Sequence, residues 1–155
     1  MEAAKIQMYT DGSSRGNPGP GGFGVVLLSG SLRKDLSQGY RRTTNNRMEL
    51  LAVIAGLEAL KKQGQHITVY SDSQYVVKAV KEGWLNNWIR NNFKGKKNKD
   101  LWLQFYELSK LHNINFVWVK GHADNAYNNI CDTLATNAAA GKNLLIDEGY
   151  ERENG

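Results

Sequence analysis

Four acidic residues in this chain occupy positions where their carboxylates could meet and bind a metal ion. They are Asp11, Glu49, Asp72 and Asp132. Carboxylate oxygens, with no cysteine and at most one histidine near them, favour Mg²⁺ or Mn²⁺ over zinc. Two such ions about 4 Å apart can clamp a phosphate, lower the pKa of an attacking water and stabilise the leaving oxygen. These residue types therefore allow metal-assisted cleavage of a phosphodiester bond.

Two of these acids also have an ordinary structural interpretation within a turn or a helix end. Asp11 and Gly12 could form the turn of a hairpin, although the next strand-like run begins only at Phe23. Glu49 could close a capping box with Asn46 at the start of a helix. For Glu49 the spacing leaves the cap and the metal site equally open.

The other two acids also allow a second interpretation. Asp72 could be a first-turn acid that the helix dipole favours, within a capping box of Ser71 and Gln74. Asp132 could be a solvated helical residue, which is the commonest position for an aspartate. Spacing alone does not establish that the four carboxylates converge.

The elements that must position these acids follow from the apolar pattern. Alternation predicts strands over 6–10, 23–28, 31–42, 67–70 and 114–119, with a glycine-rich loop from 11 to 22. The first three strands would form an antiparallel meander. If the first and fourth strands are parallel neighbours, Asp11 and Asp72 lie at the same edge of the sheet, where α/β folds place their sites.

Helical spacing predicts helices over 46–62, from 72 onward, over 100–112 and over 127–140. The region 83–99 is polar, basic and aromatic. The order βββαβ(αα)αβα gives an α/β fold, a five-stranded mixed sheet with helices packed on it. We expect one domain over 1–155 with a loosely packed tail over 141–155.

Composition limits the class of protein and its partners. The 155 residues are 41% hydrophobic, and the one cysteine, Cys131, excludes a disulfide framework and favours a reducing compartment. No signal peptide or membrane-spanning run is present, so we expect a cytoplasmic monomer with no membrane and no obligate protein partner. Net charge is +5; residues 78–99 carry six lysines, one arginine and one glutamate, or +6, which leaves −1 elsewhere. This basic patch suits a polyanion.

Five ordered segments of the chain resemble the bacterial type 1 ribonuclease H family over nearly the full length. The segments are Tyr9-Thr10-Asp11-Gly12-Ser13 with Gly16-Asn17-Pro18-Gly19-Pro20-Gly21-Gly22, Thr43-Thr44-Asn45-Asn46-Arg47-Met48-Glu49-Leu50, Ser71-Asp72-Ser73-Gln74-Tyr75-Val76, Val117-Trp118-Val119-Lys120-Gly121-His122 and the run 128–132. The resemblance implies an RNase H-like fold. It also implies an endonuclease that hydrolyses the RNA strand of RNA–DNA hybrids and leaves 5′-phosphate and 3′-hydroxyl ends.

The resemblance assigns a role to individual residues. It implies that Asp11, Glu49, Asp72 and Asp132 bind two Mg²⁺ ions, with Mn²⁺ as a substitute. It implies that His122 lies on a loop near the metals, where a side chain with an ordinary pKa of about 6.5 suits proton transfer. Positions that hold DNA phosphates are matched by Asn17 and Thr44, and positions that contact RNA 2′-hydroxyls are matched by Asn45 and Gln74.

The region 82–100 resembles the family's basic handle. Its candidate nucleic-acid contacts are Trp84, Trp88, Lys94, Lys96, Lys97 and Lys99. Lysines would neutralise phosphates, while the tryptophans could pack on sugars and bases or only on a helix pair. The lysine-rich loop is several residues shorter than is usual, and Phe93 replaces a tryptophan, which concerns the affinity for the hybrid and not the chemistry.

Three other functions are disfavoured by the residues present. An integrase-like or resolvase-like enzyme of the same fold is disfavoured by the segments 43–46 and 120–122. A non-catalytic hybrid-binding module is disfavoured because four clustered carboxylates gain nothing on anionic nucleic acid without metal. A nucleotide-binding P-loop would need Gly-Lys-Ser/Thr at the start of a helix, whereas Gly21-Gly22-Phe23 begins a strand.

Overall fold

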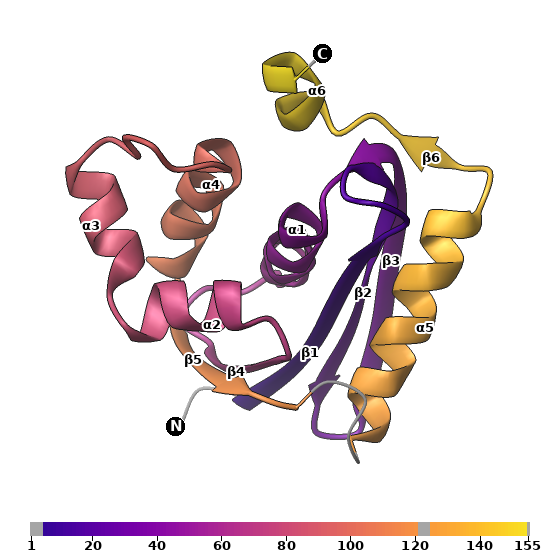
Figure 1. Ribbon diagram of the computed structural model, residues 1–155. Coiled ribbons are helices and arrows are strands. Elements are labelled where there is room, and N and C mark those ends of the chain that lie inside the picture. The colour runs from indigo at the N-terminus through magenta and orange to yellow at the C-terminus, as the bar shows by residue number, and fades with distance from the viewer. Residues whose placement is uncertain (1–4, 121–124, 155) are drawn as a thin grey trace.

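The computed structural model describes residues 5–120 and 125–154, which form a mixed sheet with helices on both faces (Figure 1). The strands are β1 (Lys5–Ser14), β2 (Gly19–Ser29), β3 (Leu32–Thr43), β4 (His66–Ser71), β5 (Asn113–Trp118) and β6 (Leu144–Leu145). Their order is β5-β4-β1-β2-β3-β6. β1, β2 and β3 form an antiparallel meander, whereas β4 and β5 run parallel to β1. The predicted α/β class is confirmed, with six strands in place of five.

The hairpin of β1 and β2 extends further than the sequence predicted. Residues 12–14, which we expected in a loop, pair with residues 21–23 in the sheet. Their many glycines hid the strand pattern, because glycine is depleted in strands and leaves no alternation to read. As a result Asp11 lies within β1, opposite Gly24, and does not end the strand.

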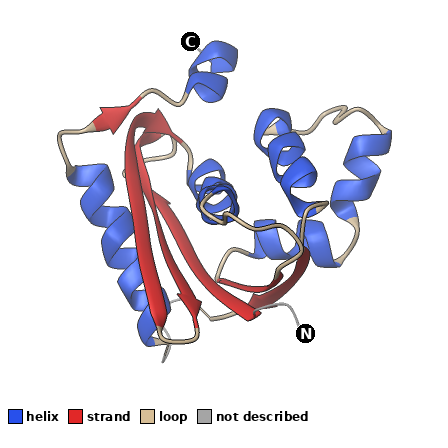
Figure 2. Cartoon of the chain, turned by 180° about the vertical axis from the view of Figure 1, so that it is seen from behind, coloured by secondary structure: helices blue, strands red, loops and turns tan. Residues whose placement is uncertain are grey.

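Helices pack on both faces of the sheet. The described residues form α1 (Asn45–Glu58), α2 (Gln74–Lys81), α3 (Trp84–Arg90), α4 (Lys99–Ser109), α5 (Ala126–Ala140) and α6 (Glu148–Asn154). α1 lies on one face and α5 on the other, as Figures 1 and 2 show. α1 is buried on most sides because α4 packs against it, and its Leu50, Val53 and Leu57 form the centre of the core. The helix that we expected from Asp72 begins at Gln74.

The handle is built on an aromatic cluster next to α1. Trp102 of α4 is fully buried, and Tyr75, Trp88 and Phe93 pack around it. Phe93 is buried in a backbone conformation with positive φ. Trp88 therefore packs against other aromatic side chains of the protein, and its contact with nucleic acid stays a prediction.

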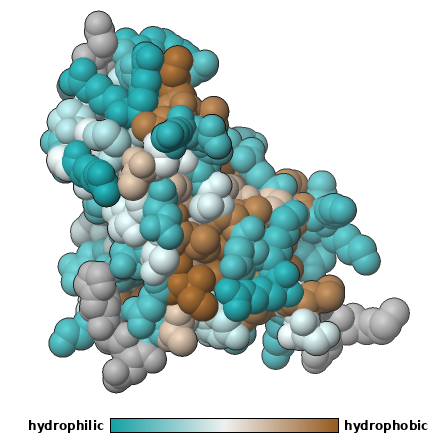
Figure 3. Space-filling model, turned by 90° about the vertical axis from the view of Figure 1, so that its right-hand side faces the viewer, coloured by the Kyte–Doolittle hydropathy of each residue, from teal (hydrophilic) through white to brown (hydrophobic). Residues whose placement is uncertain are grey.

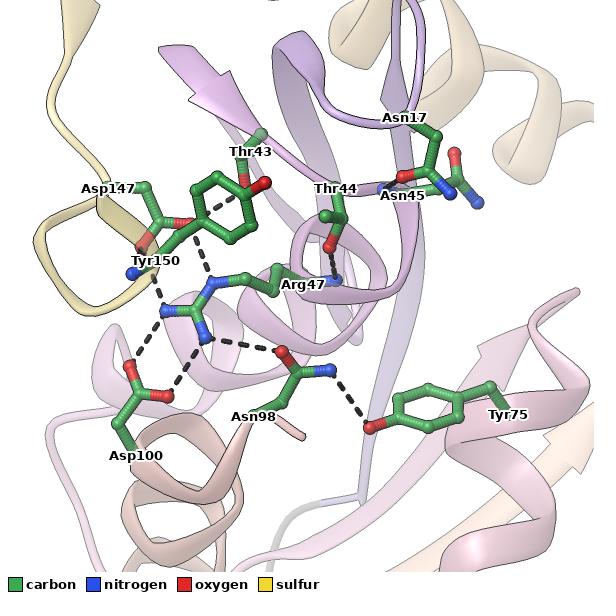
Figure 4. Close-up of polar contacts among 10 residues, drawn as sticks. All are labelled: Asn17, Thr43, Thr44, Asn45, Arg47, Tyr75, Asn98, Asp100, Asp147 and Tyr150. Carbon is green, nitrogen blue, oxygen red and sulfur yellow. Dashed lines mark hydrogen bonds and ion pairs between the residues drawn. The ribbon is translucent and has the colours of Figure 1, made fainter. Parts of the chain in front are cut away.

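The C-terminal tail contradicts the loose packing that we expected. β6 adds a parallel edge strand to β3, and Asp147 is only 6% exposed. Arg47, at the start of α1, donates two hydrogen bonds to Asp147 and two to Asp100, and Figure 4 shows how the tail and α4 meet at this guanidinium. The sequence gives no local signal for this contact, because Arg47 and Asp147 are 100 residues apart.

One face of the molecule is mostly polar. In Figure 3, hydrophilic residues cover much of the face on the right of Figure 1, with hydrophobic residues in patches between them. Within the part of the chain that the structure describes, no helix is both long enough and apolar enough to cross a bilayer.

Candidate active site

Parallel pairing of β1 and β4 brings two of the predicted acids together, just beyond the carboxyl end of that pairing. β1 and β4 are in register up to Tyr9 and Tyr70, and Asp11 and Asp72 follow each of these residues by two positions. Glu49 reaches the same point from α1. One carboxylate oxygen from each of the three residues lies within 4.8 Å of the other two. The structure therefore brings together three acids that are far apart in the sequence.

Glu49 reaches this cluster because α1 lies unusually close to β1. A Cβ atom at Gly12 would stand 2.3 Å from the carbonyl carbon of Met48, so only glycine fits there. The Gly12 amide donates to Glu49 Oε1 at 2.7 Å and to Asp11 Oδ1 at 3.0 Å. The N-cap of α1 is Thr44, whose hydroxyl accepts from the Arg47 amide. The capping-box alternative for Glu49 is therefore wrong.

Asp72 lies in the short link between β4 and α2. The N-cap of α2 is Ser73, whose hydroxyl accepts from the Val76 amide, so the predicted box of Ser71 and Gln74 is not formed. The indole of Trp118 donates to the Asp72 carbonyl oxygen at 3.2 Å. Trp118 is 44% exposed, and its support of Asp72 was not predicted from the sequence. A large aromatic residue at the exposed end of the neighbouring strand was the available signal.

Asp132 approaches the cluster from the opposite face of the sheet. α5 lies close against β2, where a Cβ atom at Gly24 would stand 2.3 Å from the Cys131 carbonyl oxygen. This contact sets Asp132, which is half-buried, beside Asp11 and Asp72 in the lining of a small cavity. Asp132 is not one of the three acids whose oxygens lie within 4.8 Å of one another. Its carboxylate nevertheless acts directly on Asp11, whose pKa it raises by its charge and by a side-chain hydrogen bond.

The electrostatics of the cluster favour the binding of a cation. Burial, then the charges of Asp72 and Asp132, raise the pKa of Asp11 to about 8. Burial, then the charges of Asp11 and Asp72, raise the pKa of Glu49 well above its ordinary value. Like charges held together in a buried place favour protonation unless a cation compensates them. Three carboxylates at this separation are a donor set that fits Mg²⁺ or Mn²⁺.

The predicted backbone-binding residues lie beside the acids at the start of α1 and α2. Asn17 Oδ1 accepts from the Asn45 amide at 3.0 Å, which fixes the β1–β2 turn against the first residue of α1 (Figure 4). Thr44 is partly buried as the N-cap of α1, and Gln74 is exposed at the first position of α2. His122 lies outside the described residues, so its predicted role stays a prediction.

The handle residues form a groove next to this surface. A cavity of about 620 Å³ lies among them, and its lining includes Trp84, Trp88, Lys96 and Lys97. Lys96 places its ammonium 5.6 Å from the centre of the Trp88 ring. Lys94 is exposed, whereas Lys99 is half-buried and donates to Asn92 Oδ1. The groove thus offers cations and aromatic faces together.

A mixed α/β sheet with clustered carboxylates at its edge, beside a basic groove, defines a class of metal-dependent enzymes that act on nucleic acids. The model of the RNase H family matches residues 3–140. The ribonuclease H of Syntrophus aciditrophicus (strain SB) is 53% identical over 151 residues, 94% of this chain and 87% of the relative. The chain belongs to the ribonuclease H family, whose enzymes are endonucleases that cut the RNA strand of RNA–DNA hybrids.

Solved structures agree with this assignment. LC9-RNase H1, described as a type 1 RNase H with the type 2 active-site motif, has a TM-score of 0.82 at 31% identity, covering 99% of this chain and 82% of its own. LC11-RNase H1, solved in complex with an RNA/DNA hybrid, has a TM-score of 0.67 at 27% identity and covers 87% of this chain and 96% of its own. The fold predicted from the sequence resemblance is thereby confirmed.

Proposed function

We propose that this chain hydrolyses the RNA strand of RNA–DNA hybrids by a two-metal-ion mechanism and leaves 5′-phosphate and 3′-hydroxyl ends. The observation that carries the proposal is the buried cluster of Asp11, Glu49 and Asp72, whose oxygens lie within 4.8 Å of one another. Within residues 5–120 and 125–154 no lysine, arginine or histidine forms an ion pair with these three acids, and the exposed Lys120 lines the cavity beside Asp11 and Asp72. Divalent ions are the partner that such a set of oxygens selects.

The resident ion in this proposal is Mg²⁺, with Mn²⁺ as a substitute. Asp11, Glu49 and Asp72 would hold the ions, and Asp132 would complete the set from α5. When bound, the pair of ions would lower the pKa of the attacking water and stabilise the charge of the leaving 3′-oxygen. The protein itself positions these carboxylates in a partly dehydrated site. Burial and like charge destabilise their ionised forms there, as the raised pKa values of Asp11 and Glu49 show.

Recognition of the substrate is assigned to the surfaces on both sides of the acids. Asn17 and Thr44 would hold DNA phosphates, while Asn45 and Gln74 would contact RNA 2′-hydroxyls. The 2′-hydroxyl distinguishes RNA from DNA at such a site. Support comes from the hydrogen bond that the Asn45 amide donates to Asn17 Oδ1 at 3.0 Å. This bond joins a residue assigned to the DNA strand to a residue assigned to the RNA strand. The related LC11-RNase H1 was solved with an RNA/DNA hybrid bound.

Three further roles belong to the proposal. His122 would move a proton during attack or product release, since an ordinary histidine pKa of about 6.5 suits that task. Trp84, Trp88 and the lysines at 94, 96, 97 and 99 would bind the hybrid in the handle groove. We infer that a monomer acts in the cytoplasm, because Asp11, Glu49 and Asp72 all come from one chain and the lone cysteine suits a reducing compartment.

The test is incubation of an end-labelled RNA–DNA hybrid with the protein and Mg²⁺. Single-stranded RNA, duplex RNA and duplex DNA of the same sequence serve as substrate controls, and Asp11→Asn serves as the protein control. We expect cleavage of the RNA strand of the hybrid alone, and only with metal. Equal cutting of duplex DNA would instead favour a strand-transfer or DNA-cleaving enzyme of the same fold.

A further inference from the structure

A small cavity beside the acidic cluster contains two buried oxygen atoms that lack hydrogen bonds. Its lining includes Asp11, Asp72, Asp132 and Asn128, and the exposed Lys120 also borders it without a hydrogen bond to either oxygen. Asp72 Oδ1 and Asn128 Oδ1 are buried, and neither has a hydrogen-bond partner within residues 5–120 and 125–154. The oxygen of Asp72 belongs to the proposed metal site. The oxygen of Asn128 has no role in the function described so far.

Both atoms are acceptors, so they cannot satisfy each other. A buried acceptor without a partner costs free energy, and native proteins place a water or an ion at most such atoms. The cavity has a volume of about 10 Å³, which is close to the roughly 10–15 Å³ that one water molecule needs. A hydrated cation held by the neighbouring carboxylates would satisfy both oxygens at once.

The first turn of α5 sets Asn128 in this position. The side chain of Asn125 caps the helix and accepts from the amides of Tyr127 and Asn128. Asn128 and Asp132 are four residues apart, so they lie on the same face of the helix. Because the contact of α5 with β2 aims Asp132 at the cluster, it aims Asn128 there as well.

We propose that Asn128 is a further oxygen donor of the metal centre and that its side-chain oxygen would contact the cation on the side of the site nearest Asp132. The inference rests on the proposed function and names a residue of the same site. A neutral carboxamide suits this position, since Mg²⁺ and Mn²⁺ accept amide oxygens. An additional carboxylate would add to the repulsion that already raises the pKa of Asp11 to about 8. Asn128 thus adds a ligand atom without adding a charge.

The test measures Mn²⁺ binding to the full chain by calorimetry, together with thermal melting in EDTA. Asn128→Leu keeps the size of the side chain and removes the oxygen. It should weaken Mn²⁺ binding by about 10- to 100-fold, the range for residues that support metal ligands, and melt at or above the wild-type temperature in EDTA. Asn128→Asp should bind Mn²⁺ more tightly and melt lower in EDTA at pH 8. Asn137→Leu, an exposed asparagine of the same helix, is the matched control and should change neither quantity.

Two results would overturn the inference. In the first, Asn128→Leu binds Mn²⁺ as the wild type does. In the second, Asn128→Leu melts lower in EDTA and Asn128→Asp binds Mn²⁺ more weakly, which would mean that the amide donates to Asp72 in the metal-free protein. Asp11→Asn in the same titration separates this inference from the proposed function. If Asp11→Asn also leaves Mn²⁺ binding unchanged, the metal centre itself is wrong.

Discussion

Helix α1 carries two buried charged clusters, and they are built in opposite ways. Arg47 meets Asp100 and Asp147, so that one cluster pairs a cation with two anions. Two residues further on, Glu49 meets Asp11 and Asp72, so that the other holds anions alone. The first arrangement stabilises the fold. The second is expensive without metal, and a protein keeps such a site for its chemistry.

The shifts in pKa express the same contrast. Burial alone would raise the pKa of Asp100, but the hydrogen bonds and charge of Arg47 lower it below its ordinary value. In the acidic cluster, burial and like charge act together, and the pKa of Asp11 rises to about 8. Asp11 is buried among other acids, whereas Asp100 is more exposed and paired with Arg47, and their pKa values shift in opposite directions.

The largest expected effect is the loss of cleavage when an acid of the cluster is changed. Asp11→Asn and Asp72→Asn each keep the shape of the side chain and remove one charge that would bind the ions. Metal ions contribute several kcal/mol to such transition states, so activity with Mg²⁺ should fall by about 10²- to 10⁴-fold. The rate of hybrid cleavage at saturating substrate measures this. A variant that cleaves normally would remove that residue from the metal site.

The half-buried Asp132 sharpens this prediction. Because its oxygens are not among those within 4.8 Å of one another, Asp132→Asn should lose less activity than Asp11→Asn in the same assay. Equal losses would place Asp132 at the centre of the site.

Breaking the ion pairs of Arg47 should lower the free energy of unfolding. Arg47→Met leaves Asp147 buried without its cation, and breaking a buried pair in this way costs about 3–5 kcal/mol of unfolding free energy. Arg47→Met combined with Asp147→Leu should recover much of that loss. Glu151→Gln removes only a surface pair with Arg41 and should cost far less than Arg47→Met. Urea unfolding gives all three values, and a mild Arg47→Met would show that the tail is not anchored there.

The two clusters should have opposite pH dependence. Asp11 has a folded-state pKa of about 8, above the unfolded value of about 3.9, so its contribution to stability is present at low pH and is lost as pH rises from about 4 to 8. Asp100 has a lowered folded-state pKa, so its contribution is present above about pH 4 and is lost below it. The melting temperature in EDTA, measured from pH 3 to 9, should therefore be highest near pH 4. Asp11→Asn should flatten only the alkaline side.

The smallest expected effect belongs to the handle. Replacing Lys94, Lys96, Lys97 and Lys99 by alanine should raise KM more than it lowers kcat, since these groups bind ground and transition states alike. For each phosphate that the variant no longer neutralises, the slope of log affinity against log salt should become shallower by about 0.7–0.9. If the slope stays unchanged, the lysines are only a solvated surface.

Local patterns predicted the parts of the molecule that local patterns determine. Alternation and helical spacing placed β4 and α1, and the parallel pairing that follows put Asp11 and Asp72 at one edge. Glu49 stayed ambiguous, because its spacing from Asn46 is the same in a capping box and in a metal site. The N-cap at Thr44 and the close approach of α1 to Gly12 decide between them.

The errors have the same origin. The tail over 141–155 carries no apolar periodicity, so it was expected to pack loosely, yet Asp147 is held by Arg47 and by the hydroxyl of Thr43. β6 has two residues and leaves no alternation. Asn128 stands in a segment that resembles the family, but its unpaired oxygen exists only in the folded cavity.

The contrast between the clusters is tested most directly by thermal melting of two matched variants in EDTA at pH 8. Glu49→Gln and Asp147→Asn each replace a buried carboxylate on one side of α1 with an amide of the same shape. Glu49→Gln should melt at or above the wild-type temperature, because it relieves repulsion, and Asp147→Asn should melt well below it, because it leaves Arg47 short of charge. If Glu49→Gln melts lower by a similar amount, Glu49 supports the fold and not a metal ion.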